Sequence, residues 1–95
     1  MMRRPLVIGN WKMNGSRHSS VELAKGVASR FDAIAQEVEA VVCPPDVFLA
    51  DVALALGGSA VGLGAQNVSQ FESGAYTGDV SASMLAELGC SCGSF

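Results

Sequence analysis

Residues 5–14 read PLVIGNWKMN, a short apolar run that turns polar within a few positions. The apolar part, residues 6–8, is continuous and does not alternate, as is typical of a strand covered on both faces. A glycine and Asn10 interrupt it, and loop-forming residues follow. We therefore expect a strand over residues 5–11 that ends in a cluster of polar side chains.

A helix is predicted after this strand. Ser19 stands three residues before Glu22, an arrangement typical of a capping box at a helix start. Apolar side chains then recur at spacings of three and four, which places them on one helix face. They are Leu23, Val27, Phe31 and Ile34. We expect an amphipathic helix that begins near Ser19 and packs through this face.

The rest of the chain repeats the alternation of strand and helix. We expect strands over residues 38–43 and 60–65, helices over 46–56 and 81–88, and a long polar loop over 66–79. Two prolines end the second strand, because proline cannot donate to a ladder. Glycines close the second and third helices.

Three strand–helix units in series predict an α/β protein with a parallel sheet and right-handed crossovers. A repeat of roughly 30 residues occurs in eightfold barrels and in doubly wound open sheets, so periodicity leaves both open. No GxGxxG motif follows the first strand, which disfavours a dinucleotide-binding sheet.

The composition describes a globular chain and excludes several classes of function. Of 95 residues, 49% are hydrophobic and 16% are charged, and the net charge is -3. Arg3 and Arg4 are the only adjacent basic pair, so no nucleic-acid partner is expected. The apolar run after them is too short for a signal peptide, and no stretch approaches the ~20 residues of a membrane span. We expect a cytoplasmic location and no membrane partner.

Three cysteines form an odd set without the spacing of a disulfide framework, as expected for reduced thiols. Cys90 and Cys92 supply too few ligands for a structural zinc site, so we expect no metal. A redox or metal module built on these two thiols is the most remote alternative.

Asn10 and Lys12 are the candidate binding residues. Both fall at the carboxyl end of the first strand, where α/β proteins hold their ligands. Because they are two apart, an extended backbone would point both side chains to one side, with Trp11 facing away. An ammonium there suits a phosphate, or an oxygen that gains negative charge during a reaction. A solvated lysine beside a turn-forming asparagine explains the spacing equally well.

Five strings of sequence, in order, carry a resemblance to a known family. The string GNWKMN at residues 9–14 closely resembles the opening signature of triose-phosphate isomerases. The later strings match the family in order and spacing: CPP at 43–45, GAQN at 64–67, GAYTGD at 74–79 and SASML at 81–85. One such string could arise by chance, whereas five in register are specific. The resemblance covers residues 5–89.

This resemblance implies the amino-terminal three β/α units of a (β/α)8 barrel. It implies interconversion of dihydroxyacetone phosphate and glyceraldehyde 3-phosphate through an enediolate, in glycolysis and gluconeogenesis and without a cofactor. The mechanism is inherited from the family and is not worked out from these residues. Carried over by position, Lys12 is the catalytic lysine that attracts the anionic substrate and stabilises developing charge. Asn10 contributes its amide to substrate binding.

The family also implies a homodimer. The loop over 66–79 would protrude into the neighbouring subunit, with Thr77 bracing the partner's catalytic region. The implied interface residues are Asn14, Gln66, Asn67, Tyr76, Thr77 and Gly78. Phe71 and Tyr76 favour an interface over a mobile surface loop, since aromatic side chains are enriched at interfaces.

Residues 90–95 read CSCGSF and lack the apolar fourth strand and the histidine segment that the family implies at this point. We expect a single partial domain over residues 1–95 with a divergent tail, and a frameshift near codon 92 is one hypothesis for that tail. His18, the only histidine, does not match the catalytic position, and the glutamate base is not found either. The fragment is therefore expected to be inactive alone. The alternative is a non-catalytic fragment that pairs with full-length subunits through the 66–79 loop.

Overall fold

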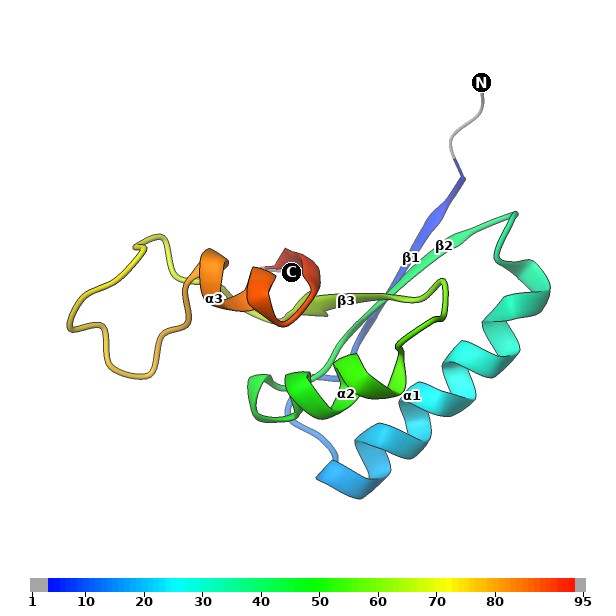
Figure 1. Ribbon diagram of the computed structural model, residues 1–95, viewed down its shortest axis with the longest axis horizontal. Coiled ribbons are helices and arrows are strands. Elements are labelled where there is room, and N and C mark those ends of the chain that lie inside the picture. Colours follow the sequence, from blue (N-terminus) through cyan, green and yellow to red (C-terminus); the bar gives the residue numbers. More distant parts are fainter. Residues whose placement is uncertain (1–3, 94–95) are drawn as a thin grey trace.

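The computed structural model of the chain describes residues 4–93, which form one parallel sheet with helices (Figure 1). The strands are β1 (Leu6–Asn10), β2 (Glu39–Cys43), β3 (Gly62–Ala65) and β4 (Cys90–Gly93). The helices are α1 (Arg17–Phe31), α2 (Leu49–Ala55) and α3 (Ala82–Glu87), with 3-10 turns at Asp32–Ile34 and Asp46–Phe48. The predicted strands and helices are confirmed, with their ends displaced by up to three residues.

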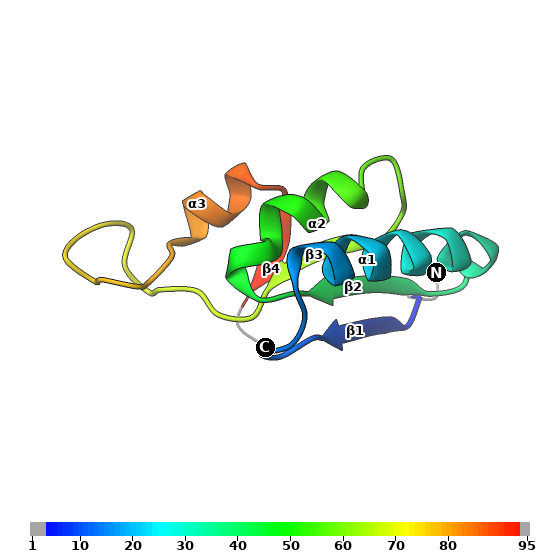
Figure 2. The ribbon, with the colours of Figure 1, turned by 90° about the horizontal axis from the view of Figure 1, so that it is seen from below.

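The strands pair in the order β1-β2-β3-β4, each parallel to the next. Figure 2 shows α1, α2 and α3 together on one face of this sheet. A doubly wound sheet carries helices on both faces and reverses its strand order, whereas a β/α barrel keeps consecutive order with all helices outside. The described residues therefore form a segment of a barrel, which settles the choice that periodicity left open.

Helix α1 begins two residues earlier than predicted, and Ser19 is not its N-cap. Ser16 is the N-cap, with its side chain accepting from the backbone N–H of Ser19 at 3.1 Å. The Ser19 hydroxyl in turn accepts from the backbone N–H of Ser16 at 2.8 Å. This pair of bonds satisfies two backbone donors at the helix start, as the predicted Ser19–Glu22 box would have done three residues further along.

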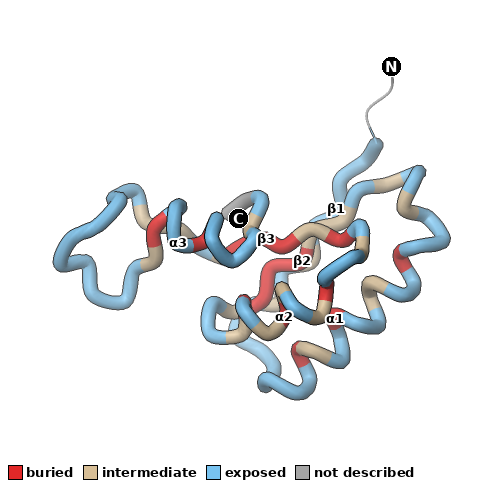
Figure 3. Tube along the Cα trace, viewed as in Figure 1, coloured by how far each residue is buried: buried red, intermediate tan, exposed pale blue. Residues whose placement is uncertain are grey.

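The hydrophobic core lies between the helices and the sheet, where the buried segments of Figure 3 gather. It draws on every helix and on β2 and β3. Its buried members are Ala24, Phe31, Val42, Leu49, Val52, Leu56, Val61, Leu63, Ala65 and Leu85. The short apolar strands and the helices thus bury each other's facing sides, as expected for a layered α/β fold.

The buried face of α1 differs from the predicted one. Of the predicted stripe, only Phe31 is buried, and Leu23 keeps 50% of its surface exposed. The buried residues in the first half of α1 are Ser20 and Ala24 instead. Small side chains on this face let the helix approach its neighbours closely, which a stripe of large side chains would prevent.

A surface ion pair joins α1 to α2. Arg17 Nε lies 3.1 Å from Asp51 Oδ2, and Arg17 Nη2 lies 3.2 Å from Asp51 Oδ1. The hydrogen bond to Asp51, followed by its negative charge, raises the pKa of Arg17 above its ordinary value. Since the arginine is exposed, this pair aligns the two helices more than it stabilises them.

Strand β4 corrects the expectation that residues 90–95 hold no strand. Its register pairs Leu63 with Cys90 and Ala65 with Gly93, and an irregularity follows Leu63. The Ser91 hydroxyl also donates to the carbonyl of Leu63 at 3.2 Å. The string CSCG has little intrinsic preference for a strand, but the free edge of β3 offers it a row of backbone partners. Residues 94–95 of the expected tail lie outside the described residues.

Strand β1 is an edge strand with little cover. Leu6 and Val7 keep 53% and 57% of their surface exposed, although successive residues of a strand point to opposite faces. Figure 3 shows this strand mostly in the colour of exposed residues. Both faces and one edge of β1 are therefore open, in contrast with the covered strand predicted from its continuous apolar run.

Candidate functional site

Three consecutive parallel strands end at Asn10, Cys43 and Ala65, and Asn10 lies in register with Cys43. The first residue after β3 is Gln66, and its side-chain Nε2 donates to two backbone carbonyls. These are Lys12 O at 2.8 Å and Cys43 O at 2.9 Å. The amide of Gln66 therefore ties the segments that follow β1 and β2 to the end of β3.

Lys12 has an unusual backbone conformation. Its φ is +55°, the only positive φ of a non-glycine residue in the part of the chain described. Side chains other than glycine enter this left-handed region at a cost of roughly 1–2 kcal/mol, so the surroundings must hold it there. The backbone N–H of Lys12 donates to Asn10 Oδ1 at 2.8 Å, and its carbonyl accepts from Gln66. The peptide groups on both sides of the Lys12 side chain are thus fixed from within the chain.

This geometry corrects the premise on which Asn10 and Lys12 were predicted to point the same way. Strand β1 ends at Asn10, and Lys12 is not extended. The oxygen of the Asn10 amide bonds the backbone two residues on, as Asx turns do. Its nitrogen is the part of the amide that this turn leaves available. The two residues still lie together at the strand end, but a turn brings them there and not an extended alternation.

Trp11 and Asn14 support the same turn from its other side. Trp11 is partly buried and packs against the core, and its backbone N–H donates to Cys43 O at 3.1 Å. Asn14 Nδ2 donates to the carbonyl of Trp11 at 2.9 Å. These side chains line a groove of about 510 Å³ beside the turn, together with Asn10, Gly15, Ser19, Ser20 and Leu23.

The other predicted interface residues lie on the 66–79 loop. In Figure 1 this loop extends away from the sheet and helices. Asn67, Tyr76, Thr77 and Gly78 are exposed, and the base of the loop is closed by the backbone bond from Ser69 N–H to Val80 O at 2.8 Å. Gln66 instead turns inward to Lys12 and Cys43. Sequence reasoning placed Gln66 at the loop's base but missed this link, whose only signal is an amide placed directly after a strand.

Neither a group of metal-ligating side chains nor a membrane-spanning helix occurs among the described residues. Among the described side chains, no three His, Cys, Asp or Glu residues gather closely enough to hold a metal ion. No helix within residues 4–93 is long and apolar enough to cross a membrane. Lys12, which lies just beyond the carboxyl end of β1, is exposed.

A parallel sheet in consecutive order, with helices on one face, defines the class as part of a (β/α)8 barrel, a fold that holds its ligands at the carboxyl ends of the strands. Known proteins agree with this assignment. A sequence model of the triosephosphate isomerase family matches residues 5–93. The chain belongs to the triosephosphate isomerase family. The match runs past residue 89 and includes β4.

Individual relatives agree with the family assignment. Triosephosphate isomerase of Nitrosococcus oceani is 52% identical over 89 residues, a match that covers 94% of this chain and 35% of the relative. That of Rhodopirellula baltica is 51% identical over 92 residues, covering 95% of this chain and 35% of the relative. A crystal structure of triosephosphate isomerase from Bartonella henselae superposes with a TM-score of 0.84 at 40% identity, covering 96% of this chain and 37% of that chain. The chain thus spans about a third of the length of the relatives it matches.

Proposed function

We propose that this chain carries the part of a triosephosphate isomerase active site that contains the catalytic lysine. Lys12 and Asn10 would bind a phosphorylated triose, and Lys12 would also act as a catalytic residue. The fixed turn around Lys12 is the observation that carries the proposal. Its costly backbone conformation is held by Asn10 on one side and Gln66 on the other. Strain held in place at a strand end is typical of a functional residue.

The chemistry follows from the charge of the lysine. An ammonium group that is oriented before the substrate arrives attracts a phosphate dianion and stabilises the oxygen that gains charge in an enediolate. The Asn10 amide nitrogen would donate to the oxygens of the same substrate. Interconversion of dihydroxyacetone phosphate and glyceraldehyde 3-phosphate in this way needs no cofactor. We propose a role in cytoplasmic glycolysis and gluconeogenesis.

Proton transfer needs two further groups, an electrophilic histidine and a glutamate base, that we do not find in this sequence. His18 is exposed in the first turn of α1 and does not lie at the carboxyl end of a strand. We therefore propose that the 95-residue chain, by itself, does not turn over substrate.

Pairing with a second subunit is the other proposed activity. The proposed interface consists of Asn14, Gln66, Asn67, Tyr76, Thr77 and Gly78. The projection of the 66–79 loop, with an exposed polar tip and exposed aromatic rings, supports this proposal. A homodimer of complete subunits would use this loop, and so would a fragment that pairs with one.

A hybrid barrel tests the proposal for Lys12. Residues 5–93 of this chain replace the matched segment of the Nitrosococcus oceani relative, and isomerase activity is measured. We expect an active hybrid, and a loss of about 100- to 1,000-fold in kcat/KM for Lys12→Met, as for removal of a group that stabilises developing negative charge. Lys25→Met, which removes an exposed lysine of α1, serves as the matched control and leaves kcat/KM unchanged. An inactive hybrid, or equal activity of the two variants, would overturn the proposal.

A further inference from the structure

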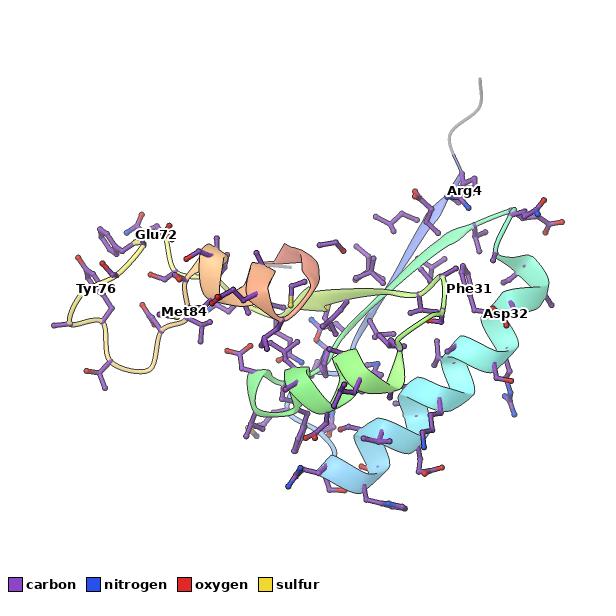
Figure 4. All side chains as sticks on the ribbon, viewed as in Figure 1. Arg4, Phe31, Asp32, Glu72, Tyr76 and Met84 are labelled. Carbon is purple, nitrogen blue, oxygen red and sulfur yellow. The ribbon has the colours of Figure 1, made fainter. Side chains whose placement is uncertain are left out.

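The 66–79 loop contains an aromatic pair that the proposed site does not use. The rings of Phe71 and Tyr76 stack face to face, with centroids 4.1 Å apart and planes inclined by 1°. Both residues remain more than 40% exposed, at 43% and 44%. Figure 4 labels Tyr76 far out on the loop. The pair therefore lies at the surface of the loop and not in the core.

Hydrogen bonds fix only parts of this loop. Phe71 N–H donates to the Ser69 hydroxyl at 3.1 Å near the base. At the tip, Asp79 N–H donates to Tyr76 O at 3.0 Å and closes a turn that presents Thr77. Between these two points, the ring stack is the contact that joins the rising and returning halves of the loop.

The body of the protein leaves a hollow beside the rings. Phe71, Tyr76 and Met84 line a pocket of about 220 Å³ between the loop and α3. Because this space lies between the rings and α3, the stack itself contributes to holding the two rings in place. Gly74 adds a second sign of close fit, since a Cβ at this position would lie 2.7 Å from Tyr76 Cε2.

We propose that Phe71 is a positioning residue for pairing between subunits. By stacking on Tyr76 it holds the turn that presents Thr77 in its binding shape before a second copy of this chain arrives. This inference rests on the proposed pairing through the 66–79 loop. A loop that is ordered in advance gives up less conformational freedom on binding, so the complex is tighter.

The test uses the complete 95-residue chain in a Val7→Lys background, because a charge on the open edge of β1 suppresses strand-to-strand association. Tyr76 is the only tyrosine, so its ring protons are assigned directly by NMR. We expect these protons to be shifted upfield by the Phe71 ring, and to lose that shift in Phe71→Leu and in Gly74→Ala. Phe71→Tyr keeps a ring in place; its two tyrosine spin systems are told apart by sequential NOEs, and the Tyr76 protons should retain the shift.

Self-association is measured on the same variants by sedimentation equilibrium. Stacked pairs contribute about 0.5–1.5 kcal/mol beyond buried area, so we expect Phe71→Leu to weaken association roughly 2- to 10-fold and Phe71→Tyr to restore it. If the upfield shift is missing in the parent chain, the stack does not position the loop and the inference fails. If Phe71→Leu loses the shift but associates as tightly as the parent, the inference fails while the proposed pairing stands. If the parent chain does not associate at all, the proposed pairing itself fails.

Discussion

Gln66 holds the lysine turn through two hydrogen bonds from one amide nitrogen. Gln66→Leu would leave the carbonyls of Lys12 and Cys43 without this donor, and a partly buried carbonyl that loses its donor costs about 1–3 kcal/mol. We expect that loss in urea unfolding of the hybrid barrel, together with a lower kcat. Gln70→Leu, at an exposed glutamine of the same loop, is the control and should stay within about 0.5 kcal/mol of the parent. Equal stability of the two variants would contradict the role of Gln66.

Two glycines at the start and in the middle of α1 should respond to alanine with opposite sign. Gly15 has a φ of +103°, and a Cβ there would lie 3.1 Å from the Ser20 hydroxyl. We expect Gly15→Ala to destabilise the hybrid barrel by about 1–2 kcal/mol. A Cβ at Gly26 would meet no atom within 4 Å, so Gly26→Ala should stabilise it by about 0.5–1 kcal/mol. Denaturant midpoints that shift in the same direction would refute this expectation.

At the scale of single residues, the sequence predicted that Asn10 and Lys12 lie together but not how they are held. The pairing of Asn10 with Lys12 was foreseen, but an Asx turn and a left-handed lysine replaced the expected extended strand. Local preference disfavours such a conformation for lysine. One of the two hydrogen bonds that hold it comes from the distant Gln66 amide to the Lys12 carbonyl. A contact across 54 positions leaves no local trace in the sequence.

The start of α1 offers a test at the scale of one element. Ser16 caps the helix through its bond from the Ser19 N–H. We expect Ser16→Ala to cost about 1 kcal/mol of stability, measured by urea unfolding of the hybrid barrel followed by circular dichroism. Ser29→Ala, at an exposed position in the last turn of α1, should change stability by less than about 0.5 kcal/mol. If instead Ser19→Ala had a far greater effect than Ser16→Ala, the helix would start where the sequence first suggested.

Helices and strands were predicted well where the hydrophobic pattern and the positions of proline and glycine agree. Strands β1 to β3 and the three helices follow from apolar runs, prolines and glycines, and the structure confirms them. Strand β4 was missed because its residues have no strand preference of their own and depend on the edge of β3. The buried face of α1 was misplaced for a related reason. Ser20 and Ala24 are buried by their small size, whereas hydrophobic spacing favours large side chains.

The described residues leave exposed a strand edge and apolar side chains that a closed barrel would cover. Barrel closure removes sheet edges, yet β1 has one open edge and exposed Leu6 and Val7. We expect the 95-residue chain, alone in solution, to self-associate, to unfold over a broad range and to show no isomerase activity. Analytical ultracentrifugation and a thermal melt monitored by circular dichroism measure the first two. A soluble monomer with one cooperative transition would contradict this expectation.

The bond from Gln66 to Lys12 also sets an order of events during synthesis. A ribosome completes the lysine 54 residues before the amide that fixes its carbonyl. Until the third strand has emerged and joined the sheet, the Lys12 carbonyl lacks the donor that holds it, and the turn depends on bonds from residues made earlier, such as the one to the Asn10 side chain. The lysine is among the first residues of the site to be made, and its placement waits on a later one. The backbone geometry of Lys12 therefore depends on assembly of the sheet and not on its sequence neighbours alone.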